Sequence, residues 1–122
     1  MMIPFLEELN KEFKKLCSES YLEYNTSESV KYPYLTYTLS SESLEDQDGF
    51  YIDVDIFDDC GANTIELENL MYDIKQHFKS NYILTEKVLL QFNYNTTRNI
   101  PTGSEMIKRR NIQLYCKVDW RE

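Results

Sequence analysis

The sequence contains few of the residues around which catalytic and cofactor sites are usually built. Among its 122 residues there are one histidine, three cysteines and three glycines. The glycines stand far apart, at Gly49, Gly61 and Gly103, so no glycine-rich loop is available to cradle a phosphate. The composition therefore gives no indication of nucleotide binding.

The three cysteines are also widely spaced. Cys17, Cys60 and Cys116 include no CxxC pair, and only His77 is available to complete a metal site with them. We expect them to be reduced thiols of a protein that is assembled in a cytoplasm, where disulfides are rare. No cofactor is expected.

Long apolar runs are missing as well. No stretch approaches the roughly 20 apolar residues that a membrane helix requires, and residues 1–10 lack the basic start and continuous apolar core of a signal peptide. We expect no membrane partner and no export by that route. A length of 122 residues suits one core, so residues 1–122 are expected to form a single domain.

Basic residues are missing from the middle of the chain. No lysine or arginine lies between Lys31 and Lys75, where acidic residues recur, whereas from Thr97 onward basic residues outnumber acidic ones. Copies with oppositely charged ends can attract each other head to tail, which is the electrostatic condition for a ring. The alternative is a solvated surface that keeps the protein soluble through its net charge of −8.

Four segments show the two-residue alternation of strands. They are residues 33–39, 50–57, 88–95 and 106–120. Two further segments show the apolar spacing of helices: residues 3–16, and a segment that starts at a cap formed by Asn63 with Glu66 and ends near residues 79–81. The order predicts an α+β fold, an antiparallel sheet of about four main strands with two helices packed on one face.

The connections differ in length. Residues 40–49 and 96–105 are expected to be long hairpin loops, and residues 21–24 form either an extra strand or a pairing arm. Long hairpin loops are places where partners often bind.

Candidate chemistry is sparse. Four carboxylates at Asp53, Asp55, Asp58 and Asp59 resemble a cation site, but Phe57 occupies a ligand position of the calcium-hand pattern, so outward strand positions explain the acids better. His77 has no serine or cysteine partner motif and is expected at a surface or boundary. A metal-dependent hydrolase is therefore the last of the functions considered, and we expect no enzyme.

The basic cluster Lys108, Arg109 and Arg110 does not predict nucleic-acid binding. In a strand Arg109 points opposite to the other two side chains, so the three form no single patch. The acidic total also opposes tight binding to phosphate.

The order of several segments is similar to that of the tail-terminator and tail-completion proteins of long-tailed bacteriophages, which help join head to tail. The resemblance covers nearly the whole chain and is carried by residues 32–37, residues 51–58, the helix opening at residues 63–67, and residues 108–110 leading into the last strand. Related head-tail joining and minor tail proteins share the same outline.

The resemblance implies a structural virion protein of a phage or prophage. Family members assemble as rings, often hexameric, at the head-proximal end of the tail, where they stop tube growth and contact tail-tube and head-connector proteins. The implied location is the virion tail, assembled in the bacterial cytoplasm, with at most non-specific passage of DNA.

Two surfaces are candidates for these contacts. We hypothesise that Asp53, Asp55, Asp58 and Asp59 contribute to an acidic lumen or subunit interface that lets DNA slide past. We also expect a mobile partner-contact loop that orders on assembly, formed by Thr97, Arg98, Asn99, Ile100, Pro101, Thr102, Gly103 and Ser104. The competing function is a monomeric adaptor or inhibitor that binds a host protein through a sheet edge.

Overall fold

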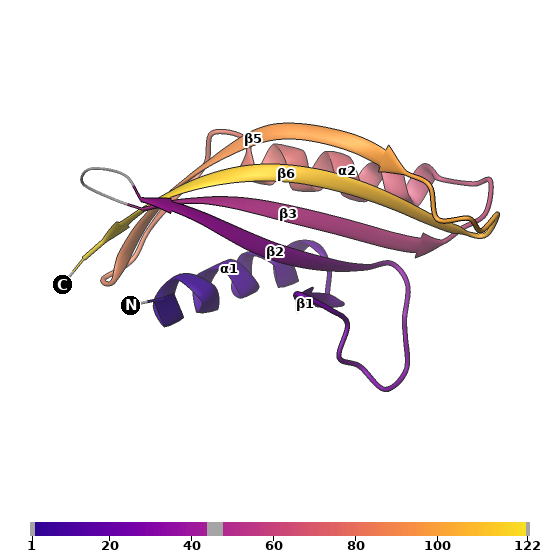
Figure 1. Cartoon of the computed structure of the whole chain (residues 1–122), viewed down its shortest axis with the longest axis horizontal. Helices are drawn as coiled ribbons and strands as arrows, with labels where there is room; N and C mark the ends of the chain where they lie inside the picture. Colours follow the sequence, from indigo (N-terminus) through magenta and orange to yellow (C-terminus); the bar gives the residue numbers. More distant parts are fainter. Residues whose placement is uncertain (1, 44–47, 122) are drawn as a thin grey trace.

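A computed structural model describes residues 2–43 and 48–121. Its α+β class agrees with the prediction (Figure 1). The elements, in chain order, are α1 (Met2–Leu16), β1 (Ser20–Leu22), β2 (Tyr34–Ser43), β3 (Asp48–Asp59), α2 (Ile65–Phe78), β4 (Tyr82–Leu84), β5 (Val88–Ile100) and β6 (Ile107–Trp120).

The six strands form one sheet in the order β1-β2-β3-β6-β5-β4. The four long strands, β2, β3, β6 and β5, lie at its centre, and each is antiparallel to the next of the four. Short β1 and β4 flank them, and β1 runs parallel to β2. The prediction of about four antiparallel strands is therefore right for the centre and wrong for the edges, where the sheet gains two strands and becomes mixed.

The edge strands have local causes. Residues 23–33 lead the chain from the end of β1 back to the starting end of β2, so the two strands run in the same direction. Of the segment 21–24, expected as an extra strand or a pairing arm, residues 21 and 22 lie in β1 and residues 23 and 24 follow it. Three-residue β4 joins β5 through a tight turn in which the Val88 amide donates to Thr85 Oγ1 at 3.0 Å. A strand so short leaves too little alternation to be predicted.

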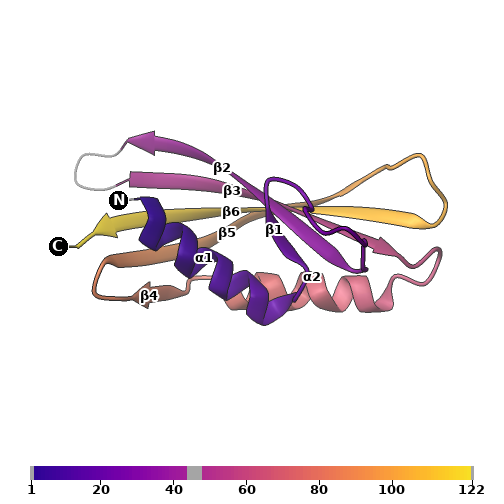
Figure 2. The ribbon, with the colours of Figure 1, turned by 90° about the horizontal axis from the view of Figure 1, so that it is seen from below.

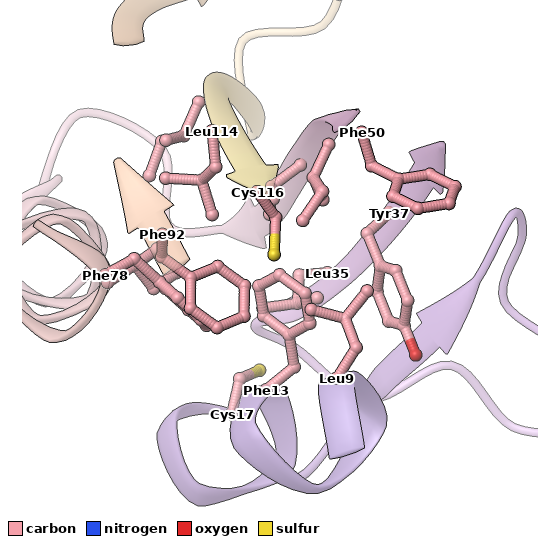
Figure 3. Packing of buried hydrophobic residues seen from close by; sticks show 14 of the residues in the cluster. Leu9, Phe13, Cys17, Leu35, Tyr37, Phe50, Phe78, Phe92, Leu114 and Cys116 are labelled. Carbon is pink, nitrogen blue, oxygen red and sulfur yellow. The ribbon is translucent and has the colours of Figure 1, made fainter. Parts of the chain in front are cut away.

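Both helices pack on the same face of the curved sheet (Figure 2). Phe13 of α1 stacks on Tyr37 of β2 with ring centroids 4.6 Å apart, and it also contacts Phe78 of α2 at 5.1 Å. Phe78 in turn meets Phe92 of β5 at 4.9 Å. These aromatic contacts join both helices to both halves of the sheet in one core (Figure 3).

The start of α2 differs from the expected capping box. The helix begins at Ile65 after Thr64, whose side chain makes no capping hydrogen bond. Asn63 lies one position further out, where its Oδ1 accepts a 3.3 Å hydrogen bond from the Ile65 amide. The Asn63 amide donates to the Cys60 carbonyl instead, so Glu66 is not needed to satisfy it.

The expected hairpin loops are shorter than predicted because the strands continue into them. β2 extends to Ser43 and β3 starts at Asp48, so residues 40–43 and 48–49 of the loop expected at 40–49 belong to strands. The rest of that loop, residues 44–47, lies outside the described residues. β5 likewise continues to Ile100, five residues beyond the predicted strand end. Within residues 2–43 and 48–121, no helix or further sheet covers the open face of the sheet, opposite the helices.

Candidate protein-interaction site

The far end of the β5–β6 hairpin, residues 95–107, is here called the hairpin end. In β5, residues 95–99 are all exposed. Successive side chains of a strand point to opposite faces, so an unbroken exposed run means that neither face of this part of β5 is covered. The strand is held in place by its pairing with β6 alone.

A β-bulge explains why the core stops there. Tyr94 pairs with Leu114 and Thr96 with Gln113, so Asn95 is an extra residue that reverses which side chains face the helices. Before the bulge, the apolar side chains of β5 face the helices. After it, the positions on that face are Thr97 and Asn99, which have no apolar group for a core to bury.

The outer edge of β5 is unpaired beyond the bulge. β4 pairs only with Leu89–Gln91, and the Phe92 amide donates to the Asn81 carbonyl at 2.7 Å. Among the described residues, no strand pairs with that edge over residues 93–100. Unpaired edges are templates for added strands, and this one carries a single charge, Arg98, and no proline before Pro101.

The other side of the sheet has a second unpaired edge. β1 pairs with β2 only from Leu35 to Tyr37. From Thr38 onward, β2 has no outer partner in residues 2–43 and 48–121.

The turn that closes the hairpin end has its own hydrogen bonds. Thr102 Oγ1 donates to the Ile107 carbonyl at 2.6 Å, and Ser104 Oγ accepts from the Met106 amide at 3.1 Å. Gly103 has φ +79°, a conformation that side chains disfavour. The structure thus divides the predicted contact loop, with residues 97–100 in β5 and residues 101–104 in this turn; its mobility remains a prediction.

The four candidate acids of β3 do not share one surface. Asp53, Asp55 and Asp59 lie on the open face, while Asp58 points to the helix side and is only 7 % exposed. The alternation of the strand separates them. Asp55 is also partly neutralised, because Arg109 Nη2 lies 3.0 Å from its Oδ1. Asp53 and Asp59 are therefore the open-face acids of this group without an ion pair in the described structure.

Asp58 sits near the start of α2. Burial raises the pKa of its carboxyl, and the neighbouring charges of Glu66 and Asp59 raise it further. Within the described residues, no three His, Cys, Asp or Glu side chains are arranged to hold a metal ion.

The basic cluster is divided as the alternation predicts. Arg109 lies on the open face with Asp55, whereas Arg110 turns to the helix side and places its Nε 3.0 Å from Glu68 Oε1 of α2. The prediction that the cluster forms no single patch is confirmed. Both ion pairs join the basic end of the sequence to its acidic middle within one chain, so part of the charge attraction expected between copies is satisfied internally.

One buried polar cluster was not foreseen from the sequence. Glu12 of α1 is 4 % exposed; its carboxylate accepts hydrogen bonds from Lys15 Nζ and from His77 Nε2 of α2, both at 2.8 Å. Burial alone would raise the pKa of Glu12, but the hydrogen bonds from Lys15 and His77 outweigh it and lower the pKa. The sequence feature that could have predicted this cluster is the position of Glu12, which stands beside Phe13 on the apolar stripe of α1.

The most distinctive features of the described residues are two strand edges without a partner strand and the exposed residues 95–99 of the hairpin end. None of the described helices combines the length and apolar character needed to cross a membrane. Neither a scan against protein-family models nor a search of curated proteins finds a match to this chain.

Proposed function

We propose that this chain is a structural virion protein that forms a ring at the head-proximal end of a phage tail. There it terminates the tail tube and helps join tail to head. Its partners are copies of itself, tail-tube proteins and head-connector proteins. The proposal draws on the resemblance in the order of segments and on the uncovered hairpin end.

The hairpin end is the observation that carries the proposal. Residues 95–99 are exposed on both faces, and no described strand pairs with their outer edge, although residues 96–99 pair with β6. Natural proteins usually shorten, charge or cover such edges, because a bare edge pairs with other chains. A protein that functions by binding neighbouring chains can use such a bare edge as its binding surface.

The open face supplies a second support. Neither Asp53 nor Asp59 has an ion pair within the described part of the chain, whereas Asp55 pairs with Arg109. If this face lines the DNA passage of a ring, its charge repels phosphate and lets the genome slide. The side chain of Asp58 points to the helix side, so we do not include Asp58 in this acidic surface.

The test has two parts. Mass photometry of the purified protein at increasing concentration should detect a ring of defined stoichiometry, and negative-stain microscopy should show its central opening. Deleting the gene from the phage or prophage that carries it should give tails of uncontrolled length that do not join heads. Normal tails after deletion, or a protein that stays monomeric at all concentrations, would contradict the proposal.

The monomeric adaptor remains the second candidate, and one observation favours it. The unpaired edge of β5 offers main-chain hydrogen bonds to any extended segment, including one from a host protein. The oligomeric state separates the two functions. A strict monomer that co-purifies with one host protein, and loses it when residues 95–99 are altered, would support the adaptor.

A further inference from the structure

We infer that neighbouring copies join edge to edge, with the outer edge of β5 in one copy pairing antiparallel with the outer edge of β2 in the next. The inference rests on the proposed ring and names the surfaces that build it. It starts from the two edges that no described strand covers, residues 93–100 of β5 and residues 38–43 of β2.

The directions of the strands suit this contact. β2 and β5 are separated by β3 and β6, and each strand of this group is antiparallel to the next, so β2 and β5 run in opposite directions. Rotation about an axis that lies roughly along the strands leaves strand directions unchanged. The contact between neighbouring copies is then antiparallel, the kind that needs no crossover. It is also head to tail, as a ring requires.

The register follows from the lengths of the edges. Across β3 and β6, Thr38 is level with Thr96 of the same copy. Placing Thr38 opposite Ile100 of the next copy, a shift of about four residues, brings residues 38–43 against residues 95–100. Strands that tilt relative to the axis of a closed sheet produce such staggers.

The faces agree in this register. Ser41 lies opposite Thr97, and both are on the helix side of their sheets. Glu42 lies opposite Thr96, both on the open face. The agreement follows from the even stagger, because residues at the same level of a sheet point to the same face and successive residues of each strand alternate.

The charges also agree. Arg98 is exposed on the open face, diagonal to Glu42 of the neighbouring copy, and diagonal neighbours are about 7–8 Å apart, within reach of long side chains. Glu42 already accepts a 2.7 Å hydrogen bond from Tyr115, which holds its carboxylate on the open face. A carboxylate can accept several hydrogen bonds, so Glu42 can bind Arg98 as well.

Disulfide trapping between single variants tests the pairing. In a Cys60→Ser background, where Cys17 and Cys116 are buried, Ser41→Cys and Thr97→Cys proteins are purified separately with tags of different mass. They are mixed at ring-forming concentration and oxidised. We expect the mixed Ser41→Cys to Thr97→Cys disulfide to exceed, by about tenfold or more, the product of either variant with the control Gln76→Cys on the exposed side of α2.

The other outcomes contradict the inference in distinguishable ways. If Thr97→Cys couples mainly to itself, the contact is a two-fold β5–β5 pairing. If mass photometry shows rings but no mixed disulfide forms, another surface joins the copies and only this inference fails. If no ring forms at any concentration, the proposed function fails with it. A Ser41→Cys, Thr97→Cys double variant should give a covalent ladder that ends at the ring size.

Discussion

Two buried carboxylates show how local surroundings decide the effect of a charge. Glu12 and Asp58 are 4 % and 7 % exposed, respectively. Lys15 and His77 donate hydrogen bonds to Glu12, and its pKa is lowered. Burial raises the pKa of Asp58, and its acidic neighbours Glu66 and Asp59 raise it further. The first carboxylate is therefore expected to stabilise the fold at neutral pH and the second to destabilise it.

Replacing Glu12 with glutamine should lower the free energy of unfolding at pH 7 by about 1–2 kcal/mol, because two charge-assisted hydrogen bonds are weakened. A lowered pKa in the folded state gives stability that is present above the ordinary value of 4.5 and lost as the pH falls below it. The gap between wild type and Glu12→Gln should therefore close in acid. Urea unfolding at several pH values measures this, with exposed Glu7→Gln as control; equal acid dependence would contradict it.

Replacing Asp58 with asparagine should have the opposite sign. A raised pKa means that the folded state favours the protonated carboxyl, so ionised Asp58 costs stability above its ordinary pKa of 3.8. We expect Asp58→Asn to raise the free energy of unfolding at pH 7 by about 0.5–1 kcal/mol and to leave ring assembly unchanged. Thermal unfolding and mass photometry check both parts. A loss of ring assembly in Asp58→Asn would contradict this prediction and indicate that Asp58 is part of the contact surface between copies.

At the scale of elements, α2 is fixed by its buried stripe. Phe78 contacts Phe13 of α1 and Phe92 of β5, and is fully buried. Phe78→Ala should lower the free energy of unfolding by about 3–5 kcal/mol, because a cavity is left between the helices and the sheet. The matched control is Tyr72→Ala, on the exposed side of the same helix, with an effect within about 0.5 kcal/mol. Chemical denaturation of both variants measures the difference; similar losses would mean that the packing is misassigned.

The elements that the sequence predicted are those with an apolar period. The stripe of α1 and the alternation at Phe50 to Ile56 are produced by burial, and both were predicted. β4 and the last part of β5 were not predicted, because their existence depends on pairing rather than burial. Thr97 and Asn99 face the helix side without any helix covering them, so no apolar pattern marks them as a strand.

The candidate site is less predictable than the core for the same reason. An unpaired edge depends on where neighbouring strands end, and β1 and β4 are too short to be placed from their residues. The sequence predicts residues 97–104 as a partner-contact loop; the structure places residues 97–100 in β5, and the contact itself stays a prediction. The sequence groups Asp58 with Asp53 because the two are close in the chain. The alternation of β3 instead places their side chains on opposite faces of the sheet.

For the whole molecule, charge should oppose assembly rather than drive it. Each copy carries a net charge of −8, and a ring brings several copies together. The basic residues Arg109 and Arg110 are already paired with Asp55 and Glu68 within the chain, so these two are less available to attract neighbouring copies. One Glu42–Arg98 contact can select the register but does not offset this repulsion.

We therefore expect salt to favour the ring. Raising the salt concentration from about 0.05 M to about 0.5 M shortens the screening length several-fold, which should lower the protein concentration at which half of the copies are assembled. Asp53→Asn with Asp59→Asn should act in the same direction at low salt, because both substitutions remove unpaired open-face charge. Mass photometry across a salt series measures both effects, with Glu7→Gln as a control for loss of charge far from the open face. Rings that dissociate as salt rises would show that attraction between the acidic middle and the basic end holds the copies together, and would favour a contact through those charges over edge pairing.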